Sequence, residues 1–336
     1  MTSSLFVRTL TAVLSAGLAF GGSGAAPSLG GPRLGLVFDS AARNLRPISG
    51  IPGAAMTGAP LPLGIAIAQA EISPAQNAAL VVGARGSAVS LVSAAGGDWV
   101  VTALDQVEPA PAKMAFSASG SAAALYYTAG QVRILTGIAA TPAVGGEIDV
   151  SSLPTPVTAL AVDDTGSYLL LAAGPAEAVS LYRVAASAQA SLLGSFRSVA
   201  SVRLFNGGQQ ALVTDTLAGV VYRITDPAGT AALQMVAGAG DGIQGLVAAE
   251  TDAAGQRLFT ASGDGTVSVS DFNGGMVTTL DCGCVPTGMF RMAGAATFRL
   301  TEVGSGPIEL LDAGSAPRIV AVPPPIRAAG PREVRR

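Results

Sequence analysis

Histidine is absent from the 336 residues, and lysine occurs once, as Lys113. Without histidine, Ser-His-Asp and Cys-His catalytic arrangements cannot be assembled, and histidine-ligated metal centres are excluded. Charged residues make up 12% of the chain and aromatic residues 5%, with a formal net charge of −3. No basic stripe with interleaved aromatics is present, so we expect no nucleic-acid partner.

Cysteine occurs only twice, in the stretch Asp281-Cys282-Gly283-Cys284. A bond between these two thiols would close a very short loop and would contribute little through loop entropy. Structural zinc sites usually have four ligands, and the sequence offers no third cysteine and no histidine. Two interpretations of these cysteines therefore remain, a local disulfide or a pair of free or buried thiols. A metal site is the least favoured interpretation.

The first residues have the order of a secretory signal peptide. A short polar start with Arg8 leads into an apolar stretch at 9–20, and small residues follow at 21–26. We expect residues 1–25 to be a signal peptide, with an uncleaved interfacial helix as the alternative. The apolar stretch is too short for a lasting membrane anchor, and no later run reaches 18 apolar residues. The mature chain is therefore predicted to be periplasmic or secreted, without a membrane span.

A short apolar alternation recurs six times after the leader, at intervals of 41 to 47 residues. Its copies begin at Val89, Val132, Val179, Val220, Val267 and Ile308. The average spacing of about 44 residues is the period of a four-stranded propeller blade.

Each copy follows a second apolar unit, and a glycine-containing turn separates the two. The segment 79–82, the turn 83–86 and the copy at Val89 are one example. Glycine supplies the positive φ angles that tight hairpins need, so each pair is predicted to form two antiparallel strands. A third unit, small and apolar, comes earlier still, as at 159–162. It fits the innermost strand, where little room is left near the axis.

These repeats predict an all-β chain, because sustained helical spacing is nearly absent after residue 26. We expect a single β-propeller of four-stranded antiparallel blades at 26–323, followed by a flexible C-terminal tail at 324–336. Radial stacking of the blades hides both faces of each sheet. A sandwich or a solenoid would also cover its sheets, but neither predicts a repeat of about 44 residues. Seven blades are predicted, as six complete repeats plus an N-terminal partial blade, against six blades with an added outer strand. In the partial blade, 34–39 is interpreted as a third strand and 45–48 as a fourth.

Two segments resemble a known group of repeats. The segment 265–271, Gly-Thr-Val-Ser-Val-Ser-Asp, is similar to the strand ending of YVTN-type and tryptophan-aspartate propeller repeats. The segment 163–169, Asp-Asp-Thr-Gly-Ser-Tyr-Leu, resembles a turn of the same repeats. The resemblance spans about 63–323 at the superfamily level, although the single tryptophan, Trp99, lies away from these repeat ends. It implies the propeller fold of exported bacterial proteins and transfers no catalytic residue.

Two functions from different classes follow. In the first, the protein is a non-catalytic extracytoplasmic binding or protein-interaction scaffold, a monomer whose partner is an unknown extracytoplasmic protein or polymer. Propellers carry function on the loops around the channel. The connections before the inner strands therefore offer candidate binding residues at Glu108, Lys113, Asp241 and Gln244.

The alternative is a propeller enzyme, either a lactonase-like hydrolase or a quinoprotein-like oxidoreductase. Such an enzyme needs several carboxylates, with an arginine or asparagine, around a metal in the central channel. Glu108, Asp241, Glu250 and Glu302 are the candidates. The sequence assigns no catalytic, cofactor-binding or metal residue, and it favours binding without a cofactor over catalysis.

Overall fold

The computed structural model describes residues 31–86, 88–95, 97–104, 107, 109–272 and 278–325. The predicted signal peptide lies outside these residues, as does the predicted tail from residue 326 onward. Within the unit that begins at Pro32, the described chain is almost entirely β-structure, with one short 3-10 helix, η1, at Ala239–Asp241. None of the described residues forms a helix long and apolar enough to cross a membrane.

The strands form six four-stranded antiparallel sheets and one three-stranded sheet. Each sheet is a continuous stretch of chain, and sequence neighbours are hydrogen-bonded neighbours. Blade 1 contains β1 (Arg33–Asp39), β2 (Asn44–Ile51) and β3 (Ala54–Thr57). Blade 2 contains β4 (Ile67–Ile72), β5 (Ala78–Gly83), β6 (Val89–Ala95) and β7 (Asp98–Ala103). Blade 3 contains β8 (Lys113–Phe116), β9 (Ala123–Tyr127), β10 (Gln131–Thr136) and β11 (Ala143–Asp149).

The remaining four blades follow the same order. Blade 4 contains β12 (Val157–Val162), β13 (Tyr168–Ala173), β14 (Val179–Ala185) and β15 (Ala190–Phe196). Blade 5 contains β16 (Ser201–Phe205), β17 (Gln210–Asp215), β18 (Val220–Thr225) and β19 (Ala232–Ala237). Blade 6 contains β20 (Leu246–Thr251), β21 (Arg257–Ser262), β22 (Thr266–Asp271) and β23 (Thr278–Asp281). Blade 7 contains β24 (Phe290–Arg291), β25 (Thr297–Arg299), β26 (Ile308–Asp312) and β27 (Arg318–Val322).

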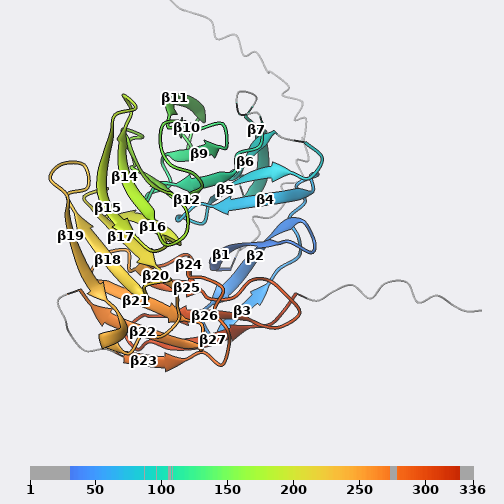
Figure 1. The fold of residues 1–336 in the computed structure, drawn as a ribbon. Coiled ribbons are helices and arrows are strands. Elements are labelled where there is room, and N and C mark those ends of the chain that lie inside the picture. Colours follow the sequence, from blue (N-terminus) through green and yellow to red (C-terminus); the bar gives the residue numbers. More distant parts are fainter. Residues whose placement is uncertain are drawn as a thin grey trace, which may run out of the picture. The chain divides into compact units, whose positions relative to one another are not determined.

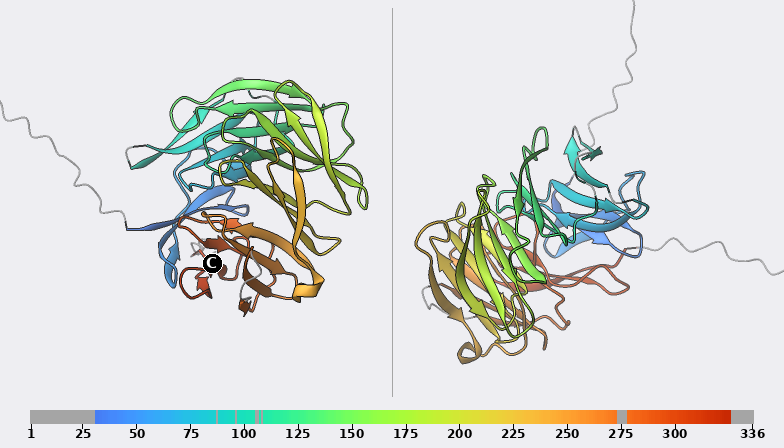
Figure 2. Two further views of the ribbon diagram at one scale, coloured as in Figure 1. Left: turned by 90° about the vertical axis from the view of Figure 1, so that its left-hand side faces the viewer. Right: turned by 45° about the horizontal axis from the view of Figure 1, so that its top comes forward.

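The blades close into a ring because each packs its faces against the blades before and after it. Among the described residues, seven buried apolar clusters occur, and each one joins two consecutive blades, including the last to the first. Figures 1 and 2 show the sheets following one another from blue through green and yellow to red. The predicted seven-bladed β-propeller is confirmed, with the N-terminal blade as the incomplete one.

Glycine fixes the hairpin turns where other residues would collide. Gly130, between β9 and β10, has a φ of 85°, and a Cβ atom there would lie 2.6 Å from the Cα atom of Ser151. Both the positive φ and the close backbone demand glycine at this turn. The regular glycines noticed in the sequence therefore mark the strand ends.

The interpretation of the first blade was wrong in one respect. The segment predicted as a third strand is β1, the innermost strand, whose residues Leu36 and Phe38 line the central cavity. The segment predicted as a fourth strand is β2, and β3 occupies the third position. The cause is that position relative to the axis depends on the neighbouring blades, whereas the local sequence reports only an apolar alternation.

Candidate functional site

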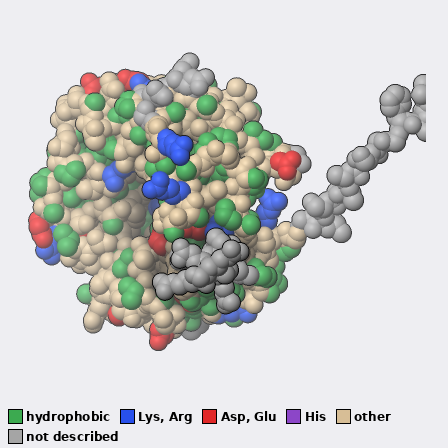
Figure 3. Space-filling view, turned by 90° about the vertical axis from the view of Figure 1, so that its right-hand side faces the viewer, with side chains coloured by type: hydrophobic (Ala, Val, Ile, Leu, Met, Phe, Trp, Pro, Cys, Tyr) green, Lys and Arg blue, Asp and Glu red, His purple; other side chains and the backbone are tan. Residues whose placement is uncertain are grey.

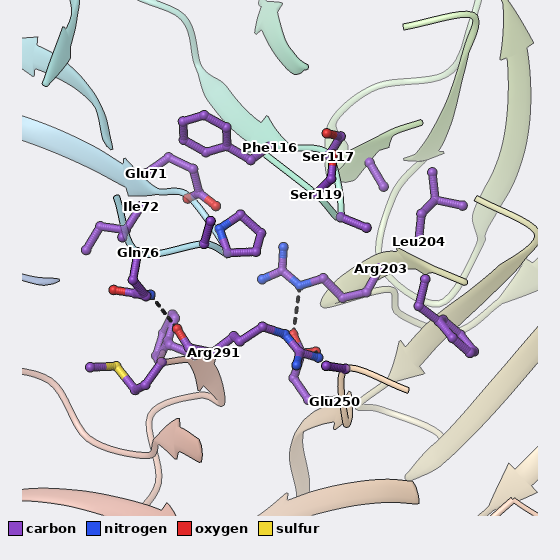
Figure 4. A pocket seen from close by; sticks show the side chains of 18 of the residues that line it. Glu71, Ile72, Gln76, Phe116, Ser117, Ser119, Arg203, Leu204, Glu250 and Arg291 are labelled. Atoms are coloured by element: carbon purple, nitrogen blue, oxygen red, sulfur yellow. Dashed lines mark hydrogen bonds and ion pairs between the residues drawn. The ribbon is translucent and has the colours of Figure 1, made fainter. Parts of the chain in front are cut away.

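A cavity of about 660 Å³ lies at the centre of the ring. Its walls are mostly the C-terminal halves of the innermost strands and the turns that follow them, contributed by all seven blades. The volume falls within the range of about 300–1,000 Å³ that is usual for small-molecule sites. Figure 4 shows charged side chains from several blades pointing into this space.

Three charged residues occupy the same repeat position on three inner strands, and Arg291 lies one residue further along its own strand. At the shared position Glu71 pairs across its hairpin with Leu80, Arg203 with Leu212 and Glu250 with Phe259, whereas blade 7 has Phe290 there, paired with Arg299. The shared register sets Glu71, Arg203 and Glu250 at one level of the ring. Because blades 5, 6 and 7 are consecutive, Glu250 stands between the two arginines, whereas Glu71 comes from blade 2, on the other side.

Glu250 is held by both arginines. Its Oε1 accepts a hydrogen bond from Arg203 Nε at 3.1 Å, and its Oε2 lies 3.5 Å from Arg291 Nη2. The Glu250 side chain is 9% exposed, whereas that of Arg203 is 39% exposed. A molecule that enters the cavity therefore meets the guanidinium of Arg203 rather than the carboxylate of Glu250.

Gln76 fixes the opposite end of the arginine pair. Its Nε2 donates to the backbone oxygen of Arg291 at 2.5 Å, and its Oε1 accepts from the backbone nitrogen of Leu36 at 2.7 Å. Arg291 Nη2 in turn donates to the backbone oxygen of Thr251 at 2.5 Å. Arg291 is thus held at its Nη2 atom by Thr251 and Glu250.

Arg203 keeps donors available. Only its Nε donates a hydrogen bond to Glu250, and within the described part of the chain neither of its Nη atoms makes a hydrogen bond. Burial lowers the pKa of Arg203, but the charges of Glu250 and Glu71 outweigh it and raise the pKa overall. The guanidinium is therefore charged at every accessible pH, and Figure 4 shows its free end turned into the cavity.

Glu71 faces Arg203 from the opposite wall (Figure 4). It makes no hydrogen bond and no ion pair with any described residue. Burial raises the pKa of its carboxyl to about 6, against an opposing effect of the Arg203 charge. The cavity therefore presents one unpaired carboxyl and one partly unpaired guanidinium to whatever enters.

The residues predicted from the loops lie elsewhere. Lys113 begins β8, whereas Phe116 at the far end of that strand lines the cavity. Asp241 belongs to η1, where its carboxylate accepts a hydrogen bond from the backbone nitrogen of Gly238 at 2.9 Å. Gln244 is exposed on the connection that follows, and Glu108 lies outside the described residues. The structure brings none of the three described residues into the cavity.

Two of the carboxylates considered for an enzyme do line the cavity, namely Glu250 and Glu302. Glu302 is paired with Arg299 at 2.8 Å, so both carboxylates already have guanidinium partners. Across the residues that the structure describes, no three Asp, Glu, Cys or His side chains gather into a group that would hold a metal ion.

Cys282 and Cys284 are joined by a disulfide in the connection between blades 6 and 7. Cys282 is buried in the apolar cluster between these blades, and Cys284 is half-buried beside it. The bond is local and lies away from the residues that line the cavity.

The structure adds three candidate residues that the sequence did not suggest: Glu71, Arg203 and Arg291. Each is the single charge of its inner strand, as in Val202-Arg203-Leu204. For Glu71 and Arg203 the available signal was a charge at the fixed repeat position opposite a leucine of the second strand. This signal can be read only when the pairing of the hairpin strands is known.

Comparison with known proteins identifies the class of fold. A protein of unknown function from Desulfotomaculum acetoxidans is 13% identical, with a TM-score of 0.62 over 87% of this chain and 99% of that one. A candidate 6-phosphogluconolactonase from Bacteroides fragilis is 12% identical, with a TM-score of 0.59 over 87% and 94%. The β-propeller domain of Cps50 (Swd1) from Myceliophteria thermophila is 12% identical, with a TM-score of 0.51 over 83% and 96%.

At these identities the likeness concerns the fold alone. The chain is a seven-bladed β-propeller, similar in fold to proteins of unknown function and to lactonase-like propellers. No family model and no curated protein matches its sequence.

Proposed function

We propose that the protein is a non-catalytic binding module outside the cytoplasm, and that its central cavity takes a small molecule carrying a carboxylate or phosphate group. The observation that carries this proposal is the pair of unpartnered Nη atoms of Arg203, turned into a cavity of ligand size. A guanidinium binds carboxylate and phosphate oxygens through two parallel N–H donors.

Glu250 prepares Arg203 for this role. Because it holds the Nε atom, the guanidinium plane is fixed and both Nη groups stay free for a ligand. A donor that is already oriented loses less side-chain entropy on binding than a free one. On the face in Figure 3 the charges are scattered among apolar and uncharged atoms. The cavity is the candidate site for anion recognition.

The location outside the cytoplasm is supported by the signal-peptide pattern of residues 1–25 and by the disulfide between Cys282 and Cys284. Disulfides persist in oxidising compartments and are rare in the cytosol. Detection of the mature chain in the periplasmic or culture fraction, with a new N-terminus near residue 26, would support this part of the proposal. A full-length chain found only in the cytoplasm would contradict it.

Anion binding is tested by titration calorimetry with acetate, succinate and inorganic phosphate at pH 5.5. At this pH, below the pKa of about 6 for Glu71, its carboxyl is mostly uncharged and repels an anion least. We expect at least one probe to bind, and Arg203→Gln to weaken that binding by about 10-fold or more, as for hydrogen bonds to charged groups. The three probes also separate a carboxylate site from a phosphate site.

Arg318→Gln is the matched control, because Arg318 is an exposed rim residue paired with Asp312. It is expected to bind like the unaltered protein. The proposal fails when no anion binds, or when Arg203→Gln binds as well as the control.

One observation favours a second candidate, a metal-free hydrolase of sugar-acid lactones. Glu71 has a pKa of about 6, near the value suited to a general base, and it faces a guanidinium that can stabilise an oxyanion. In this mechanism Glu71 takes a proton from water, the water oxygen adds to the lactone carbonyl, and the ring C–O bond breaks with protonation of the leaving oxygen. The described function of the Bacteroides fragilis neighbour suggests 6-phosphogluconolactone as substrate.

Lactone hydrolysis followed by pH-stat decides this candidate. If the protein hydrolyses the lactone faster than buffer alone, and Glu71→Gln abolishes this activity, the enzyme proposal replaces the binding-module proposal. Equal rates with and without protein would eliminate the enzyme.

A further inference from the structure

The cavity contains an unpaired acceptor as well as unpaired donors. Glu71 on β4 has no hydrogen bond or ion pair with the described residues, although it lies in the cavity wall. A half-buried carboxyl without a partner is costly, and such groups usually have a hydrogen-bond donor or a cation in contact. No described residue makes a hydrogen bond or ion pair with Glu71, and Arg203 acts on it across the cavity only through its charge.

Position in the ring separates Glu71 from the arginines. Glu71 belongs to blade 2 and Arg203 to blade 5, at equivalent positions of their hairpins. The two side chains therefore reach into the same space from opposite walls, as Figure 4 shows. A molecule between them meets a negative group on one side and a positive group on the other.

We propose that the ligand of this cavity is a small zwitterion, whose ammonium group binds Glu71 and whose carboxylate binds the Nη atoms of Arg203. This inference rests on the proposed binding function and narrows its ligand class. The apolar part of the ligand lies against the cavity walls, which include the phenylalanines Phe38, Phe116 and Phe205.

Charge balance favours a zwitterion over a plain anion. Glu71, Arg203, Glu250 and Arg291 together carry no net charge when Glu71 is ionised. A plain anion places a negative charge in front of the unpaired Glu71 carboxylate, in a site partly screened from water. A zwitterion adds no net charge and gives Glu71 its missing partner.

The surroundings of Glu71 contain no competing charge on the strands packed beside it. Strand β5 has no titratable residue, and Lys113 of β8 lies at the other end of its strand. On β1, Asp39 is paired with Arg46, and Arg33 lies at the opposite end, over the Trp99 ring. Arg203, across the cavity, is the charge that acts on Glu71.

The test compares matched pairs of ligands by calorimetry at pH 7.5. The zwitterions are 4-aminobutanoate, 6-aminohexanoate and leucine, and their partners without the amine are butanoate, hexanoate and 4-methylpentanoate. We expect at least one zwitterion to bind about 10-fold or more tightly than its partner, as for hydrogen bonds to charged groups. Glu71→Gln should remove this preference.

Glu309→Gln is the control, since burial also raises the pKa of Glu309 but this residue lies on β26, outside the cavity lining. It should keep the preference for the zwitterion.

The unaltered protein gives a second readout through pH. Protonation of Glu71 removes the partner of the ammonium, so zwitterion affinity should fall about tenfold from pH 7 to pH 5, through the pKa of about 6. The amine-free acids should show the opposite trend, because protonation removes repulsion.

The outcomes separate the two proposals. Amine-free acids that bind at pH 7.5 as tightly as the zwitterions, with affinity lost in Arg203→Gln, overturn the zwitterion and leave the anion site standing. When neither class binds at any pH, both proposals fall.

Discussion

At the scale of single residues, the ion pair between Asp39 and Arg46 is the most deeply buried one in the described part of the chain. Arg46 Nε lies 2.6 Å from Asp39 Oδ2, and the two side chains are 10% and 6% exposed. Removing one partner of a buried pair leaves the other charge without compensation. We therefore expect Asp39→Asn to lower the free energy of unfolding by about 3–5 kcal/mol, measured by urea unfolding. Asn can still accept the hydrogen bond from the backbone nitrogen of Ala42, so the loss of stability measures the effect of removing the charge.

The same variant makes a pH prediction. Burial raises the pKa of Asp39, but hydrogen bonds from Ala42 and Arg46 and the Arg46 charge outweigh it and hold the pKa below its ordinary value. The stability contributed by this carboxylate is therefore present above the unfolded pKa and lost as pH falls through the folded one. The difference between the two proteins should be full at pH 7 and shrink below about pH 4. Asp312→Asn, in the exposed pair with Arg318, should cost only about 0–1 kcal/mol; equal losses would contradict the argument.

The limits of the sequence at this scale are visible in the cavity. The absence of histidine excluded histidine-based chemistry from the sequence alone. Glu250 was considered among channel carboxylates, but its two arginine partners come from neighbouring blades, 47 and 41 residues away in the chain. Such pairings depend on the blade count and hairpin register, which single residues do not reveal. Glu71 was missed for the same reason.

At the scale of elements, Gly35 of β1 controls how the first blade meets its neighbours. A Cβ atom at Gly35 would lie 2.3 Å from Gln76 Oε1, and the residue has a φ of 145°. Gln76 is the side chain that bonds both Leu36 of blade 1 and the backbone of Arg291 in blade 7. Glycine at this bulge therefore allows one side chain of blade 2 to connect three blades.

We expect Gly35→Ala to be more destabilising than Gly53→Ala in urea unfolding. Gly53 also has a positive φ, 85°, but a Cβ atom there meets nothing within 4 Å, so it reports backbone strain alone. Displacement of Gln76 adds the loss of two hydrogen bonds, or about 1–3 kcal/mol. In a Gly35→Ala background, Gln76→Ala should then cost little. Equal losses at the two glycines, or additive effects of Gly35 and Gln76, would refute this account.

The elements also show what the sequence predicts well. Strands two and three of each repeat were found because apolar alternation and glycine turns are local signals, and β5 and β6 illustrate both. The order of strands in blade 1 was misread because β1 carries the same alternation as an outer strand, Leu-Gly-Leu-Val-Phe. Only its contacts with β4 and with blade 7 make it the inner strand. Strand position is therefore set by partners rather than by local sequence.

At the scale of the whole molecule, the ring closes without exchange of strands between its ends. Each described blade is one continuous stretch of chain, so blades 1 and 7 meet through contacts between two separate sheets. These include the cluster containing Val37, Ile48 and Leu310, and the bond from Thr57 Oγ1 to the backbone oxygen of Pro323 at 3.0 Å. The 44-residue period predicted the number of blades, but the closure involves residues too distant in the chain to leave a periodic signal.

This closure makes blade 1 the expected first point of opening. Among the described residues, its clusters with blades 7 and 2 contain eight buried residues each, whereas the clusters on either side of blade 4 contain fourteen each. Regions with less buried apolar area open at lower free energy. In hydrogen exchange at low urea, amides of β1 and β2 should therefore exchange before those of β12 and β13. Leu310→Ala, in blade 7 at this seam, should accelerate exchange in β1 while leaving β13 nearly unchanged. Uniform protection around the ring would mean that the propeller opens as one cooperative unit, and that its closure is as strong as its other interfaces.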